Sequence, residues 1–135
     1  MVADSGAAQT DGPHASDSLV VPSLPASIAS VRRFAVQACR QSGMGFLCDT
    51  VALLVSEVAT NALVHGTGDV QVRVITEDSM LRVEVSDDSP TMPTPRTADP
   101  MEEGGRGLAL VASLASDWGV HRAGVGKVVW FELAA

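Results

Sequence analysis

The chain has 135 residues, a length that suits one compact domain. Hydrophobic residues make up 46% and charged residues 19%, which provides for a core and excludes a globally disordered chain. The net charge of −7, with no basic cluster larger than the pair Arg32 and Arg33, argues against a direct DNA- or RNA-binding groove.

Targeting signals and cysteines point to a cytoplasmic protein that is not bound to a membrane. No segment reaches the ~18 consecutive apolar residues of a membrane span. The N-terminus has neither the basic region nor the apolar region of a signal peptide. Cys39 and Cys48 have no metal-ligand pattern near them, and we expect both to be buried, reduced thiols.

The first elements are a tail, a strand and a helix. Residues 1–17 are small, polar and acidic, which predicts a disordered tail before a single domain at 18–135. Residues 18–24 form a strand candidate, and Pro22 suits an edge strand. Pro25 then opens a helix, with Ser23 or Ser27 as its cap. Its apolar positions have helical spacing: Ile28, Val31, Phe34, Ala35, Ala38 and Cys39.

A second helix is expected at about 48–64, and it carries a polar stripe. Its apolar positions widen into a broad face, which predicts a well-buried helix: Val51, Leu53, Leu54, Val55, Val58, Ala62 and Leu63. Glu57, Asn61 and His65 follow at intervals of four residues, so they share one side of the helix.

The second half of the chain changes to a period of two. Residues 69–78 and 79–88 alternate apolar and polar side chains around a short turn, which predicts a hairpin. Residues 88–105 contain four prolines and no apolar periodicity, as in a functional loop or lid. A third helix is expected near Gly105, followed by two strands joined by a turn at 124–126. The order predicts an α+β fold, a two-layer sandwich with a mostly antiparallel sheet of about five strands and three helices.

Four polar features interrupt this plan: the stripe on the second helix, the pair Asp87 and Asp88, the run at 102–110 and the run at 124–133. Each alone has an ordinary explanation, such as a solvated turn or a flexible helix entry. Together they supply a carboxylate base, a hard oxygen ligand for Mg²⁺, an acceptor for an exocyclic amine, and glycines at a helix N-terminus that suit a phosphate. These are the parts of a Mg-ATP site.

This set, in this order, resembles the histidine-kinase-like (GHKL) ATPase superfamily, and within it the small anti-sigma-factor serine/threonine kinases. EVATNALVHG is similar to the N box, VEVSDDSP to the first glycine box, GGRGLALV to the second, and DWGV with GKVVWFEL to the last strand pair. The resemblance covers nearly the whole chain and implies the Bergerat-type ATP-binding fold, with 88–105 as the ATP lid.

The resemblance implies a role for each matching residue. Glu57 is the catalytic base, Asn61 is the Mg²⁺ ligand and Asp87 contacts adenine. The nucleotide-binding set is Asn61, His65, Asp87, Gly104, Gly105, Arg106, Gly107 and Leu108. Two departures are expected to weaken ATP binding. Residues 88–90 replace the usual glycines after Asp87, and Val128 stands where a threonine often supports that aspartate.

The leading functional hypothesis is a kinase that transfers the γ-phosphate of ATP to a Ser or Thr of an antagonist protein in a partner-switching pathway. Its partners would be a sigma factor, that antagonist, or both, and the free edge of the first strand could pair with a second copy. The alternative is a non-catalytic module of the same fold that senses nucleotide or sequesters partners. A sensor histidine kinase, a DNA-topology ATPase and a purely structural domain fit the sequence less well.

Overall fold

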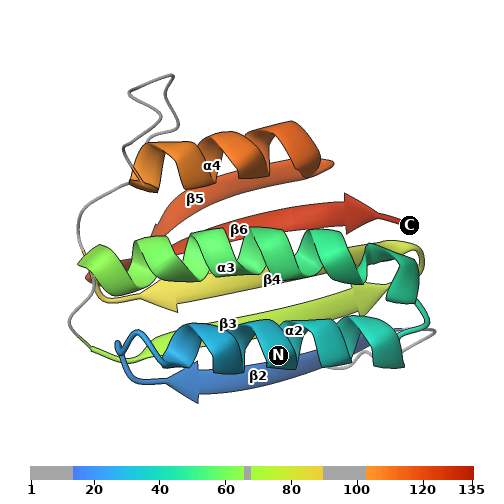
Figure 1. The fold of residues 1–135 in the computed structure, drawn as a ribbon, viewed down its shortest axis with the longest axis horizontal. Helices are drawn as coiled ribbons and strands as arrows, with labels where there is room; N and C mark the ends of the chain where they lie inside the picture. Colours follow the sequence, from blue (N-terminus) through green and yellow to red (C-terminus); the bar gives the residue numbers. More distant parts are fainter. Residues whose placement is uncertain (1–13, 66–67, 90–102) are drawn as a thin grey trace.

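The computed structural model describes residues 14–65, 68–89 and 103–135 (Figure 1). In chain order the elements of these ranges are β2 (His14–Val21), α2 (Ser27–Gln41), the short 3-10 helix η1 (Gly45–Leu47), α3 (Cys48–His65), β3 (Val70–Glu77), β4 (Met80–Asp87), α4 (Glu103–Leu114), β5 (Asp117–Ala123) and β6 (Gly126–Ala134).

The five strands form one sheet in the order β2-β3-β4-β6-β5, and all four neighbouring pairs are antiparallel. The helices α2, α3 and α4 lie on one face of this sheet, with α3 in the middle (Figure 1). The core fills the space between the two layers. The predicted α+β two-layer sandwich is therefore confirmed, including the hairpin between β3 and β4.

The first strand is longer than expected. β2 begins at His14, which is the register partner of Glu77 on β3, so residues 14–17 are part of the sheet rather than of a tail. Residues 1–13 lie outside the described residues. Pro22 follows directly after the strand, and β2 is an edge strand, as its proline indicated.

The helix cap predicted at Ser23 or Ser27 is wrong. The N-cap of α2 is Ala26, and it makes no side-chain cap bond. The hydroxyl of Ser27 donates to the carbonyl of Pro22 at 2.8 Å, and that of Ser23 donates to the carbonyl of Gly68. Both serine hydroxyls therefore donate to backbone carbonyls near the β2–α2 connection, and neither caps the N–H groups of the helix.

Helix α3 is the central helix of the core. Its expected inner positions are fully buried: Val51, Leu54, Val55, Val58 and Ala62. Leu53, expected to widen this face, is instead 41% exposed, because it points away from the sheet. By length and composition alone, the stretch Gly45–Val64 is also apolar enough to span a membrane, and in this fold its buried side packs on the sheet and on α2.

The two cysteines are free thiols, and they differ in burial. Cys39 is fully buried, and its thiol lies 2.9 Å from the carbonyl oxygen of Met44. Burial, with a smaller effect of the neighbouring Cys48, raises the pKa of the Cys39 thiol to about 11. Cys48 is only half-buried, so the expectation of two buried thiols holds for Cys39 alone.

Candidate nucleotide-binding site

The polar stripe on α3 leads to an unpaired oxygen inside the protein. Glu57 is half-buried, and Asn61, one turn later, is only 6% exposed. Within the described ranges, the Asn61 side-chain oxygen Oδ1 has no hydrogen-bond partner. His65 is the last residue of the helix, and its side chain lies outside the part of the protein that the structure describes.

An unpaired buried amide oxygen fits a bound cation. Buried polar atoms are nearly always hydrogen-bonded, and leaving one unpaired costs about 1–3 kcal/mol. Mg²⁺ is often held by only one or two protein oxygens, with phosphate oxygens and waters completing its shell. In the described part of the chain, no cluster of three His, Cys, Asp or Glu side chains offers another metal site. Asn61 therefore suits a Mg²⁺ that arrives with a phosphate ligand.

The glycine-rich run forms the start of α4. The helix begins at Glu103, two residues before the expected start, so Gly104 and Gly105 are in its first turn. The first four N–H groups of a helix have no partner within it, and the helix dipole favours an anion there. Leu108 is buried against the core and anchors this end. The side chain of Arg106 and the lid residues 90–102 lie outside the described part.

Asp87 is the last residue of β4, and it is held by a lysine. Lys127 Nζ lies 2.8 Å from Asp87 Oδ2 and 3.0 Å from Oδ1, and both side chains are almost completely buried. The backbone N–H of Ser89 also donates to Oδ1, at 2.8 Å. The predicted adenine acceptor is thus already engaged within the protein.

The register explains this ion pair and corrects the role expected at Val128. Asp87 is the register partner of Lys127, whereas Val128 is the partner of Ser86 on the other face of the sheet. The residue that faces Asp87 is therefore Lys127, and the side chain of Val128 lies on the opposite face of the sheet. The strands also approach closely here, because a Cβ on Gly126 would lie 1.8 Å from the carbonyl oxygen of Asp87.

The four predicted features come together at one end of the molecule. In Figure 1 the end of α3, the start of α4, the end of β4 and the start of β6 all lie at the same edge of the sandwich. Asn61, the first turn of α4, Asp87 and Lys127 are thus brought to one region by elements from four parts of the chain. The topology of the fold therefore brings the four predicted sequence features to the same end of the molecule.

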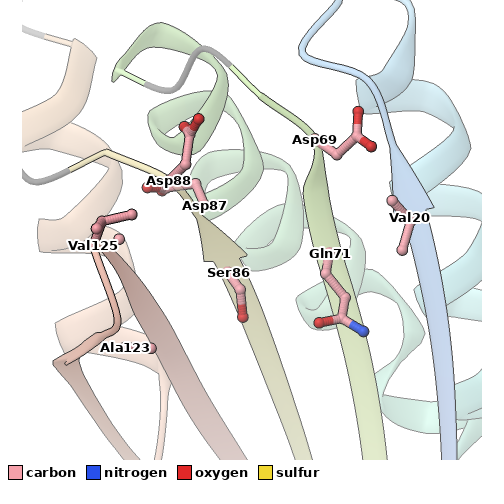
Figure 2. A pocket seen from close by; sticks show the side chains of 9 residues that line it. Val20, Asp69, Gln71, Ser86, Asp87, Asp88, Ala123 and Val125 are labelled. Atoms are coloured by element: carbon pink, nitrogen blue, oxygen red, sulfur yellow. The ribbon is translucent and has the colours of Figure 1, made fainter.

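A separate hollow of about 320 Å³ lies at this end, on the face without helices (Figure 2). Gln71 and Ser86 line it; they are register partners and alternate with the core residues of β3 and β4. Asp87 also borders the hollow, but its carboxylate is buried beside Lys127. This hollow is therefore distinct from the region between α3 and the sheet where Asn61 is buried.

Lys127 is a residue of this region that was not predicted from the sequence. The sequence does contain a signal for it. One side of the last strand carries Lys127, Val129, Phe131 and Leu133, and the last three of these are core residues. A lysine in the first inward position of such a strand needs a buried anion. Asp87 is the register partner that supplies it.

Comparisons with known proteins agree with this architecture. The family model of the histidine kinase-like ATPase domain matches residues 21–133. The histidine kinase domain of the blue-light activated histidine kinase from Erythrobacter litoralis EL346 is 27% identical, with a TM-score of 0.52, and the match covers 84% of this chain and 61% of that one. Another structure of that kinase is 34% identical, with a TM-score of 0.47, and the match covers 64% and 31%.

No curated protein matches the chain. The chain spans less than two thirds of the length of either kinase structure. The family match covers more than four fifths of the chain, including α3, β4, α4 and β6. The chain therefore belongs to the histidine kinase-like ATPase domain family.

Proposed function

We propose that this domain binds Mg-ATP and transfers the γ-phosphoryl group to a Ser or Thr of an antagonist protein, as an anti-sigma-factor kinase of a partner-switching pathway. Membership of an ATPase-domain family supports ATP binding. The observation that carries the proposal is Asn61, whose buried side-chain oxygen has no partner among the described residues and follows Glu57 by one helical turn. A ligand that brings a cation gives this oxygen its partner.

The proposed chemistry divides between the two residues. Glu57 accepts the proton of the attacking hydroxyl, the hydroxyl oxygen bonds to the γ-phosphorus, and ADP leaves. Asn61 holds Mg²⁺, which when bound neutralises phosphate charge. The N–H groups of Gly104 and Gly105 in the first turn of α4 suit the phosphates, whereas Gly107, the fifth residue of the helix, lies beyond the unpaired N–H groups.

The remaining predicted contacts complete this proposal. Asp87 reads the base, and His65, Arg106 and Leu108 border the nucleotide. The protein partners are a sigma factor, the antagonist, or both, in the cytoplasm, without nucleic acid or membrane; the net charge of −7 argues against a nucleic acid. A homodimer through the free edge of β2 is part of the same proposal.

A second candidate, a non-catalytic module that sequesters partners, is favoured by one observation. The Asp87 carboxylate is occupied by Lys127 and by the Ser89 N–H. Such a site binds the purine base of a nucleotide less tightly. A sequestering module would instead work through its contacts with partner proteins alone.

Two variants separate the candidates when Mg-ATP affinity is measured by calorimetry and transfer is measured with radiolabelled ATP and candidate antagonists. Glu57→Gln should leave the affinity nearly unchanged and lower transfer by about 10²-fold or more, because a base acts mainly in the transition state. Asn61→Leu should weaken both, because it removes the metal ligand. Glu84→Gln, on the helix-free face, is the control and should change neither.

The outcomes are distinct. Absence of label on every antagonist, with ATP bound at saturation, favours the sequestering module. Absence of Mg-ATP binding at millimolar concentration contradicts the kinase, and it leaves only a module that works through protein contacts. An Asn61→Leu variant that binds Mg-ATP as tightly as the native protein would contradict the assigned metal ligand.

A further inference from the structure

The only lysine of the chain is placed at the candidate base-reading position. Lys127 supplies one of the nine Lys and Arg residues, and the other eight are arginines. It is 0% exposed, and its ammonium contacts both oxygens of Asp87, at 2.8 and 3.0 Å. The position proposed to read the base is therefore an acid–ammonium pair rather than a lone carboxylate.

The hydrogen-bonding capacity of this pair is only partly used. Each carboxylate oxygen accepts about two bonds. Asp87 Oδ1 accepts from Lys127 Nζ and from the N–H of Ser89, so it is full, while among the described residues Oδ2 accepts from Nζ alone. The ammonium has three N–H donors, and the pair takes up two of them. One acceptor and one donor thus remain side by side.

The pair is built into the sheet. Asp87 and Lys127 are register partners on adjacent strands. The two strands lie so close at Gly126 that a Cβ there would clash with the backbone of Asp87. Moving Lys127 away would leave a buried ammonium and a buried carboxylate without their partners, which is strongly unfavourable. Lys127 therefore stays beside Asp87, and a ligand that reaches this buried position meets the pair intact.

We propose that Lys127 is the residue that sets base selectivity, and that it makes the site accept 6-amino and 6-oxo purine triphosphates alike. This inference rests on the nucleotide binding proposed above. A lone carboxylate accepts hydrogen bonds only, so it favours the 6-amino group of adenine and rejects the 6-oxo group of hypoxanthine or guanine. With Lys127 present, Oδ2 meets an amino group and Nζ meets an oxo group.

The test compares ligands that differ at position 6 alone. Calorimetry on the full chain measures the dissociation constants of Mg-ATP, Mg-ITP and Mg-tripolyphosphate, which has no base. The native protein should bind ATP and ITP within about tenfold of each other. Lys127→Met should favour ATP by about 10- to 100-fold, the range for one hydrogen bond to a charged group. Lys127→Arg keeps a cation beside Asp87 and should retain the native ratio.

The outcomes distinguish this inference from the function on which it rests. A native protein that prefers ATP over ITP by more than 100-fold overturns the role of Lys127, and this result needs no variant to fold. An unchanged ratio in folded Lys127→Met overturns it too. Tripolyphosphate binding as tightly as ATP shows that the base is not read at all, which also overturns it. Failure of all three ligands to bind contradicts the proposed nucleotide binding itself.

Discussion

Replacing Lys127 by methionine tests the most unusual contact of the fold. Methionine keeps most of the apolar stem and removes the ammonium, so the packing changes little and Asp87 becomes a buried carboxylate without its cation. Removing one partner of a buried ion pair costs about 3–5 kcal/mol. Because unfolding entropy scales with chain length, each kcal/mol should lower the Tm of a chain of this size by roughly 3–4 °C. The expected loss is therefore about 9–20 °C.

Urea unfolding followed by circular dichroism gives the free energy of unfolding for this variant. The matched control is Arg73→Met, because the Arg73–Glu84 ion pair spans 3.7 Å and the arginine side chain is 50% exposed, so its loss should cost no more than about 1 kcal/mol. The double variant Asp87→Asn/Lys127→Met removes both charges, and its cost should fall about 1–3 kcal/mol short of the sum of the single costs.

Two results would refute the reasoning. Lys127→Met could cost no more than Arg73→Met, which would mean that the ammonium is not buried against Asp87 in solution. The costs of Asp87→Asn and Lys127→Met could also add fully in the double variant, which would mean that the two side chains do not interact. In either case the inference about base selectivity loses its physical basis.

Three further predictions concern other residues. Gly126→Ala should prevent folding or cost several kcal/mol in the same urea unfolding assay, because its Cβ would lie 1.8 Å from the Asp87 carbonyl oxygen. Gly43→Ala, with open space but a φ of 79°, should cost about 1–2 kcal/mol. Asn61→Leu should leave the Tm without nucleotide unchanged or higher, because it removes an unpaired buried oxygen, and a loss above about 2 kcal/mol would contradict this. Burial raises the pKa of the Cys39 thiol from 9.0 to about 11, so the unfolded chain releases this proton at a lower pH than the folded protein does. The free energy of unfolding should therefore fall as the pH rises from about 9 to 11. Urea titrations at several pH values should show this fall in the native protein and not in Cys39→Ala.

The sequence predicted the fold well wherever one period dominated. The helical period of α3 and the two-residue period of β3 and β4 each bury one face, so both elements and their hairpin were identified. The errors occur where local signals compete with tertiary pairing. The polar composition of residues 14–17 predicted a disordered tail. In the structure these residues pair with β3, and no local sequence pattern encodes that pairing.

The candidate site was predicted in part, for a similar reason. Asn61 and Gly105 could be found from spacing along one helix or at a helix start. The partner of Asp87 could not, because it depends on which residue of β6 lies across from the end of β4. A difference of one residue in that register exchanges Lys127 for Val128 and moves the contact to the other face of the sheet.

The contrast between Asn61 and Asp87 indicates which part of a nucleotide this site would bind most strongly. The Asn61 oxygen is buried without a described partner, so a cation that reaches it relieves an existing cost of about 1–3 kcal/mol. The Asp87 carboxylate already accepts three hydrogen bonds inside the protein, and its pair with Lys127 leaves one acceptor and one donor, so a base adds a single hydrogen bond there. Affinity should therefore come mainly from the metal and the phosphates. Removing the base from the ligand should consequently cost less binding free energy than removing the Asn61 oxygen from the protein.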